Sequence, residues 1–271
     1  AYSWYDFAQA AKNDHYYDPA SGTYKGGFVI NAEGEKEAIK GRSSFIMKKK
    51  VKVYPDTLCW LKDLTYAYNE PFVREYFSHI GYDNYPVVGV NWHQAQAFCN
   101  WRTQYFNSNA GVRVQAWRLP NEVEWEYAAR GGLSGAKYPW GGPYTRNKKG
   151  CFLANFKPLR GNYISDGGFT TVPVGTYEPN GFGLYDMAGN VAEWTGDAFD
   201  ESAYQVTHDL SPYYQITAKK SDNKILKRKV IRGGSWKDIA YFMQCGVRTY
   251  EYADSARSFI GFRTVRTRIE Y

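Results

Sequence analysis

Apolar and polar positions follow two different periods along the chain, and the helical period is clearest in its middle. Between residues 91 and 107 apolar side chains recur at helical spacing, which predicts a helix with one buried stripe. Asn91 opens this segment with Gln94 three residues later, an arrangement typical of a capping box. The stripe that we expect to be buried comprises Trp92, Ala95, Phe98, Cys99 and Tyr105.

A second, shorter helix is predicted soon afterwards. Asn121 precedes Glu124 by three residues, which makes a second capping box, and the glycine pair 131–132 would end the helix in a left-handed turn. A short apolar run stands before each helix, at residues 86–90 and 117–119. We expect both runs to be strands.

Short strands and turns are predicted elsewhere. Residues 1–85 are interrupted by glycine and proline turns, with a helical stretch near residues 4–11. Lysines alternate with valines over residues 48–53, as in an edge strand protected by charge. Residues 229–232 and 259–265 alternate apolar and basic side chains, which favours strands with one face in the core.

Composition adds rings and positive charge to this picture. The 271 residues include 25 Tyr, 15 Phe, 9 Trp and 26 Gly, which is typical of bulky rings held by irregular, turn-rich backbone. The formal charge of +7 leaves two interpretations open, a soluble basic surface or an acidic partner. No nucleic-acid-binding signature is present, so we expect no nucleic-acid partner. The sequence contains no run of about 18 apolar residues, which is the length needed to span a membrane.

The metal-binding and nucleophilic residue types form no familiar catalytic pattern. Cys59, Cys99, Cys151 and Cys245 are far apart in sequence without a CxxC pair, which argues against a zinc site and a dense disulfide framework. The four histidines are scattered without ligand spacing, and no Ser-His-Asp order or phosphate loop is present. We expect Cys99 to be a small buried apolar group.

Six segments, in order, closely resemble the formylglycine-generating-enzyme (sulfatase-modifying-factor) family. They read PVVGVNW at residues 86–92, RLPNEVEWEYAARGG at 118–132, YPWG at 138–141, NGFGLYDMAGNVAEW at 180–194, IRGGSW at 231–236 and DSARSFIGFR at 254–263. The resemblance implies an α+β, C-type-lectin-like fold with little regular secondary structure, two main helices and short twisted sheets. We expect one domain over residues 1–271, with an insertion at about 20–80 and the family's opening strands missing.

Three further segments resemble a particular subgroup, the gliding-motility and type IX secretion lipoproteins of the GldK/PorK kind. They read PDTLCW at residues 55–60, YNEP at 68–71 and KGCFLANFKP at 149–158. This resemblance implies a non-catalytic subunit at the periplasmic face of the outer membrane, in a ring-like homo- and hetero-oligomeric assembly with a periplasmic partner protein. The chain starts at Ala1 rather than Met, so we expect a processed chain, with any lipid anchor upstream.

The chemistry of the family's oxidase is missing from the sequence. That oxidase holds copper between two cysteines a few residues after its RGGS motif, because thiolates favour Cu(I). The matching positions here fall near Asp238 and residues 241–243, and Cys245 aligns better with a structural cysteine. We therefore expect no enzyme. Two alternatives stay open, a glycan- or peptidoglycan-binding module and a formylglycine-generating-type oxidase.

Calcium is the cofactor that the resemblance implies, as one or two structural ions. Calcium takes six to eight oxygen ligands from carboxylates and backbone carbonyls, and glycine lets a loop turn its carbonyls inward. The first predicted set comprises Asn155, Phe156, Asp166 and Gly168, and the second comprises Asp186, Gly189, Val191 and Glu193. The alternative for the second set is that Asp186 and Glu193 are buried carboxylates paired with Arg232 or Arg263.

Overall fold

The computed structural model describes residues 51–65, 69–109, 114–158, 162–206, 213–218 and 221–267, together with the backbone of four short strands before them. The chain divides into two compact units, Ala1–Lys52 and Val53–Tyr271, which are described separately. The helix expected near residues 4–11 and the lysines of the expected edge strand at 48–50 lie outside the described residues. The prediction of a single domain stays a prediction.

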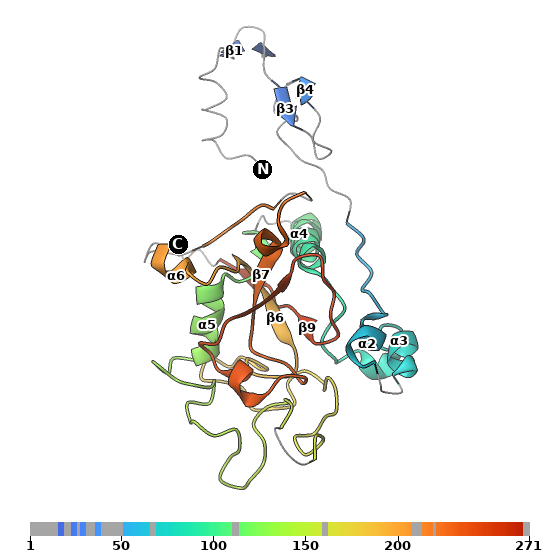
Figure 1. Cartoon of the computed structure of the whole chain (residues 1–271), viewed down its shortest axis with the longest axis vertical. Coiled ribbons are helices and arrows are strands. Elements are labelled where there is room, and N and C mark those ends of the chain that lie inside the picture. Colours follow the sequence, from blue (N-terminus) through green and yellow to red (C-terminus); the bar gives the residue numbers. More distant parts are fainter. Residues whose placement is uncertain are drawn as a thin grey trace. The chain divides into compact units, whose positions relative to one another are not determined.

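The first unit contains two small antiparallel hairpins (Figure 1). In the first hairpin β1 (Tyr16–Asp18) pairs with β2 (Thr23–Lys25). In the second, β3 (Phe28–Ile30) pairs with β4 (Lys36–Ala38). Each strand has three residues, so the described part of this unit has only short regular structure.

A four-stranded sheet lies at the centre of the second unit, in the order β8-β7-β6-β9. Strand β6 (Ala192–Ala198) is buried at every position, so it forms the middle of the core. It pairs antiparallel with β7 (Arg228–Arg232) and parallel with β9 (Ile260–Gly261). Strand β8 (Thr249–Tyr252) completes the sheet on the far side of β7.

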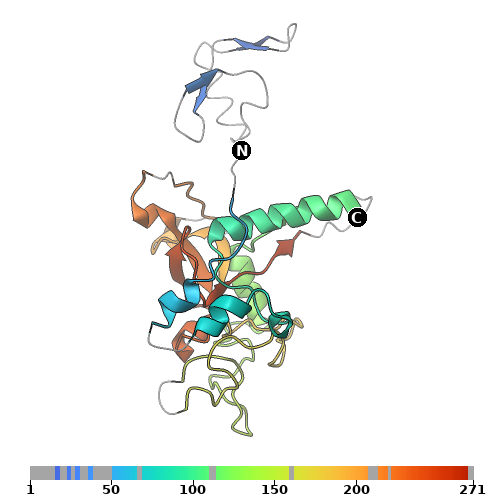
Figure 2. The same cartoon turned by 90° about the vertical axis from the view of Figure 1, so that its right-hand side faces the viewer.

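Helix α4 (Trp92–Asn109) confirms the first predicted helix and its cap. The amide of Gln94 donates to Oδ1 of Asn91 at 2.9 Å, and the amide of Asn91 donates to Oε1 of Gln94 at 2.8 Å. These two bonds satisfy amides that a helix start otherwise leaves without partners. In Figure 2 the helix, in green, runs out past the sheet.

Helix α5 (Glu122–Arg130) confirms the second predicted helix. Its capping box joins Asn121 and Glu124 through bonds of 2.7 and 2.9 Å. It ends at Gly131, whose φ of 57° lies in the left-handed region that glycine tolerates. Both capping boxes are local, which explains why the sequence predicted them.

The remaining regular structure consists of short elements. Strands β5 (Trp117–Arg118) and β10 (Val265–Arg266) form a separate antiparallel pair. The other elements are α2 (Cys59–Asp63), α3 (Glu70–Glu75), α6 (Ala203–Val206) and the 3-10 turns η2 (Ile80–Tyr82), η3 (Lys224–Lys227) and η4 (Ala240–Met243). Within the described residues, none of the helices combines the length and apolar character that crossing a bilayer requires.

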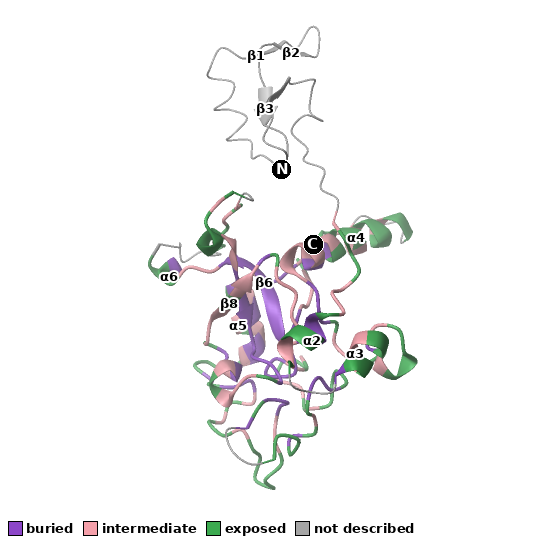
Figure 3. Ribbon diagram, turned by 45° about the vertical axis from the view of Figure 1, so that its right-hand side comes forward, coloured by how far each residue is buried: buried purple, intermediate pink, exposed green. Residues whose placement is uncertain are grey.

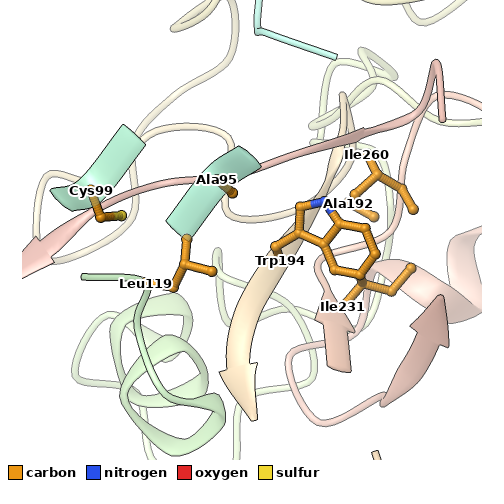
Figure 4. Close-up of a cluster of buried hydrophobic side chains, with 7 residues drawn as sticks. All are labelled: Ala95, Cys99, Leu119, Ala192, Trp194, Ile231 and Ile260. Atoms are coloured by element: carbon orange, nitrogen blue, oxygen red, sulfur yellow. The ribbon is translucent and has the colours of Figure 1, made fainter. Parts of the chain in front are cut away.

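The core joins the start of α4 to the sheet. Trp194 of β6 is fully buried and packs with Ala95 and Cys99 of α4, and with Leu119 and Ile260 (Figure 4). A second cluster places Trp60 and Trp236 in stacked contact, with ring centroids 6.2 Å apart. The expected burial of Cys99 is confirmed; Trp125, Trp194 and Trp236 are buried as well, whereas Trp140 is half-buried.

Three strand predictions were wrong. Residues 86–90 form no strand, because Gly89 adopts a φ of +67° and bonds separately to Arg257 and Asp56. The segment 259–265 is divided between β9 and β10, which belong to different sheets. Residues 51–53 form no edge strand, and the side chain of Val53 is 74% exposed. Period-two patterns do not show where a strand stops.

The predicted buried stripe of α4 was wrong at Phe98 and Tyr105. Ala95 and Cys99 are buried, but Phe98 is 40% and Tyr105 is 58% exposed. The buried positions of the helix end at Cys99, and the helix then extends past the sheet (Figure 3). Helical spacing indicates which residues share a face, and does not show how far the packing partner reaches.

Candidate functional site

The loop after β7 contains the positions at which the oxidase family would carry its two cysteines. Oγ of Ser235 donates to Oδ2 of Asp238 at 2.6 Å, and burial raises the pKa of Asp238. Met243 is fully buried in an apolar cluster. One expected thiolate position therefore holds a hydrogen-bonded carboxyl group, and the other holds a core side chain.

Cys245 is the single cysteine of this loop, and it is buried beside Trp125, Ala129 and Met187. Its thiol has no disulfide partner, and burial raises its pKa to about 11. In the absence of a metal ion, a thiol with that pKa is protonated at neutral pH. No second cysteine stands near Cys245 in the sequence, so the loop offers no thiol pair for copper.

The first predicted calcium set is brought together around Asn155 and Asp166. Asn155 is fully buried; its Nδ2 donates to the carbonyl of Thr170 at 2.8 Å, and its Oδ1 has no hydrogen-bond partner. Asp166 is buried and accepts the amides of Phe156 at 2.8 Å and Gly168 at 3.4 Å. Burial raises the pKa of Asp166, since these partners are neutral.

In the second predicted set, both oxygens of Glu193 have hydrogen-bond partners, whereas only one oxygen of Asp186 has. Glu193 accepts Nε and Nη2 of Arg263 at 2.5 and 2.7 Å, and Nε1 of Trp125 at 2.8 Å. Oδ2 of Asp186 accepts the amide of Gly175 at 2.8 Å, while its buried Oδ1 has no hydrogen-bond partner. Burial, followed by the nearby charge of Glu193, raises the pKa of Asp186.

The alternative interpretation therefore holds for Glu193, which pairs with Arg263. Arg232 pairs elsewhere, and the contact of Arg263 with Asp186 is a 3.4 Å bond to the backbone carbonyl. Asp186 itself adopts a φ of 54°, which is unusual for a residue other than glycine. Among the described residues, no cationic side chain donates a hydrogen bond to the carboxylate of Asp186.

Backbone contacts join the two sets. The carbonyl of Asn155 accepts the amide of Asn190 at 2.8 Å. Gly189 has a φ of +76°, and a Cβ on it would come within 2.3 Å of that same carbonyl. Oδ1 of Asn190 accepts the amide of Val172 at 3.0 Å, which binds a third loop to the pair. The loop that carries the second set is therefore fixed against the loop of the first.

A cavity of about 350 Å³ lies beside the second set. Asp186, Val191, Glu193 and Arg263 line it together with apolar side chains that include Phe262. Two carboxylates and one guanidinium give this lining a formal charge of −1. The lining therefore has a surplus of negative charge, and one of its residues, Asp186, has a buried oxygen without a hydrogen-bond partner.

Calcium fits the first set well and the second in part. Among the described residues, no three His, Cys, Asp or Glu side chains gather closely enough to hold a metal ion by themselves. An ion would therefore need amide and backbone oxygens, which calcium uses readily. The first set offers an orphan amide oxygen and a carboxylate with neutral partners. In the second set, Arg263 already compensates Glu193.

A buried ion network beneath α5 was missed by the sequence analysis. The side chain of Arg232 is fully buried and pairs with Glu122 at 3.1 Å and Glu126 at 2.5 Å. Arg248 also pairs with Glu122, at 2.5 Å. The sequence-based predictions assigned no partner to either glutamate. Their spacing of four residues, which puts them on one helix face, was the available signal.

The fold and site together define a small sheet and two helices that support long, hydrogen-bonded loops, without a thiol pair. The family profile described as "Sulfatase-modifying factor enzyme 1-like domain" matches residues 30–268. The formylglycine-generating enzyme of Streptomyces coelicolor is 35% identical over 189 residues, which cover 68% of this chain and 53% of that protein.

Two further comparisons extend this result. The inactive C-alpha-formylglycine-generating enzyme 2 of Bos taurus is 35% identical over 185 residues, covering 66% of this chain and 49% of its own. The structure of PvdO from Pseudomonas aeruginosa superposes with a TM-score of 0.53 at 27% identity, covering 68% of this chain and 62% of that one. The chain spans about half the length of the curated relatives it matches.

The chain belongs to the sulfatase-modifying-factor family of formylglycine-generating-enzyme-like domains. The predicted fold class is confirmed, a mixed α and β fold with few helices and short curled sheets. The family includes both enzymes and inactive members. Membership of the family is therefore compatible with a non-catalytic role, but it does not by itself decide between a catalytic and a non-catalytic protein.

Proposed function

We propose that this protein is a non-catalytic structural subunit of the type IX secretion and gliding-motility machinery. The observation that carries the non-catalytic part is the Ser235–Asp238 hydrogen bond at a position where the oxidase needs a thiolate. The remaining cysteine of the loop, Cys245, is buried with a pKa raised to about 11. Oxygen chemistry that depends on two copper thiolates has no ligand pair in this loop.

The proposal for the machinery rests on the three GldK/PorK-like segments. Two of them contribute to packing in the structure: Trp60 of the first is fully buried, and Asn155 of the third holds the loop junction described above. The existence of an inactive relative in Bos taurus supports a role for this fold that does not need oxidase activity. On this proposal the protein lies at the periplasmic face of the outer membrane, with a ring-forming periplasmic partner protein.

Calcium would serve as a structural ion in this scaffold. Asn155, Asp166 and the carbonyls of Phe156 and Gly168 would hold one ion, and Asp186, Glu193 and the carbonyls of Gly189 and Val191 would hold a weaker second. When bound, calcium supplies positive charge to buried carboxylates that otherwise carry a desolvation penalty. The buried Oδ1 atoms of Asn155 and Asp186, which have no hydrogen-bond partner, support this proposal.

Affinity purification from a native envelope tests the assembly proposal. The tagged chain is isolated under mild detergent, its companions are identified by mass spectrometry, and the complex is imaged in negative stain. We expect other secretion subunits and a ring-like particle. Recovery of monomer alone, or of peptidoglycan fragments without any secretion subunit, would contradict the proposal, and the second result would favour the glycan-binding alternative.

A further inference from the structure

Helix α4 presents a row of exposed aromatic rings from its middle towards its outer end. Phe98, Trp101 and Tyr105 follow at spacings of three and four residues, and Trp101 is 54% exposed. The rings of Trp101 and Tyr105 stack with centroids 5.2 Å apart, and Phe98 contacts Trp101 at 5.6 Å. Figure 3 shows this end of the helix as exposed. Such a row is costly to leave in water, and Trp and Tyr are enriched at protein interfaces.

Positive charge accompanies these rings. The guanidinium groups of Arg102 and Arg266 both lie over Trp117, at 3.9 and 5.3 Å from its ring centroid. Residues 92–118 and 258–269 contain no Asp or Glu. The salt bridges of the described residues engage Arg118 and Arg263 from these segments, but neither Arg102 nor Arg266. We call Phe98, Trp101, Arg102, Tyr105 and Arg266 the α4 face.

A second exposed surface has the opposite character. At the end of α3 and around η2, Glu75 and Asp83 are exposed, and Ile80 is 79% exposed between them. Residues 69–91 carry three carboxylates and one arginine, a formal charge of −2. That arginine already pairs with Glu70, and no salt bridge among the described residues engages Glu75 or Asp83. We call Glu75, Ile80 and Asp83 the α3 corner.

We propose that the α4 face of one copy of this chain docks on the α3 corner of a second copy. Two arginines meet two carboxylates, and Ile80 meets exposed aromatic rings. Trp, Tyr and Arg are the residue types that dominate binding energy at interfaces, and opposite charges steer the encounter. Pairing of two α4 faces would bring like charges together, which opposes that arrangement.

The contact is heterologous, since each copy uses a different surface from its neighbour. A heterologous contact repeats, so it produces rings or open chains rather than closed dimers. The inference deepens the proposed function, because it gives the assembly subunit a self-contact, and it rests on that proposal for its biological setting. It is also independent of which partner protein completes the assembly.

Two variants separate the surfaces. The face variant combines Tyr105→Ala with Arg266→Glu, and the corner variant combines Glu75→Lys with Asp83→Lys. All four side chains are exposed, so folding should survive, which circular dichroism and the melting curve would verify. Tyr144→Ala is the matched control, because Tyr144 is a 76% exposed aromatic residue outside both surfaces.

Sedimentation velocity over a concentration series is the measurement. The natural chain and the Tyr144→Ala control should associate beyond dimers, and each variant alone should associate roughly tenfold or more weakly, as for hot-spot residues. An equimolar mixture of the two variants should form a complex of two chains and stop, because the mixture retains one intact face and one intact corner.

Two results would overturn the inference. One is a natural chain that stays monomeric at every concentration, and the other is an associating natural chain whose variant mixture does not form the two-chain complex. Neither result touches the proposed function, which depends on the subunits recovered from the envelope. Conversely, self-association without secretion subunits in the envelope purification would leave this contact standing and remove the proposed function.

Discussion

The backbone carbonyl of Asn155 accepts the amide of Asn190 at 2.8 Å, and this bond fixes two loops that are 35 residues apart in sequence. Each loop carries one set of candidate calcium ligands. Because the bond joins backbone atoms, it limits the choice of residue at the position packed beside it more than the choice at positions 155 and 190. Gly189 is that neighbour, and its missing side chain leaves room for the carbonyl.

Replacing this glycine should therefore destabilise the protein strongly. In Gly189→Ala, the new Cβ would lie 2.3 Å from the Asn155 carbonyl oxygen. Gly183→Ala is the matched control: its φ of +74° is similar, but nothing lies within 4 Å of the added Cβ. The control should cost about 1–2 kcal/mol from backbone strain, and Gly189→Ala should cost more. Urea unfolding measures both, and equal costs would show that the loops can separate without penalty.

Chelation should lower thermal stability. Calcium at about 100 times its dissociation constant adds about 2.7 kcal/mol to the free energy of unfolding, which corresponds to several degrees in a domain of this size. Calorimetry in calcium and in EDTA checks this, with Asn155→Ala expected to abolish most of the difference. An unchanged melting curve in EDTA, with no calcium in elemental analysis, would remove the metal from the account.

Removing the buried guanidinium of Arg232 should be severe. Arg232→Met leaves Glu122 and Glu126 without this partner in the interior, and breaking a buried pair costs about 3–5 kcal/mol. Arg74→Met removes an exposed pair with Glu70 on α3 and should change little. Denaturant midpoints of the two variants give the comparison, and similar values would mean that the buried network is not structural.

Asp197 should make stability depend on pH. It is buried, accepts the amides of Glu122 and Tyr214, and burial raises its pKa from 3.8 to about 6. The folded state therefore binds this proton more tightly than the unfolded state, so the contribution of Asp197 to stability falls as pH rises from 3.8 to about 6.

The total change from this residue is about 3 kcal/mol at most, at 1.36 kcal/mol per pKa unit. Asp197→Asn should remove this slope, because the amide does not titrate. The free energy of unfolding of both proteins, measured in EDTA across that pH range, tests the prediction. Parallel profiles for the two proteins would assign the pH dependence to other carboxyl groups.

Local signals accounted for the two longest described helices, α4 and α5. Capping boxes at Asn91 and Asn121 involve side chains three residues apart, so the sequence contains all of their chemistry. Strand ends were harder, since they depend on partners far along the chain. Residues 259–265 read as one strand, and yet β9 pairs with β6 while β10 pairs with β5.

The sequence predicted which residues form the candidate site better than it predicted which of their side chains form ion pairs. The family motifs named both calcium sets, and contacts join Asn155 to the loop of Gly189. The choice between Arg232 and Arg263 as the partner of Glu193 could not come from sequence. Arg232 stands opposite Glu193 in the sheet register, but its side chain turns to Glu122 and Glu126 of α5.

The most direct test of the non-catalytic account is an oxidation assay. The purified chain is incubated with Cu(I), oxygen and a cysteine-containing peptide, and the peptide is analysed by mass spectrometry beside an active formylglycine-generating enzyme. The account predicts an unchanged cysteine, because Asp238, Met243 and the buried Cys245 provide no thiolate pair. Copper-dependent conversion of that cysteine to formylglycine would contradict it.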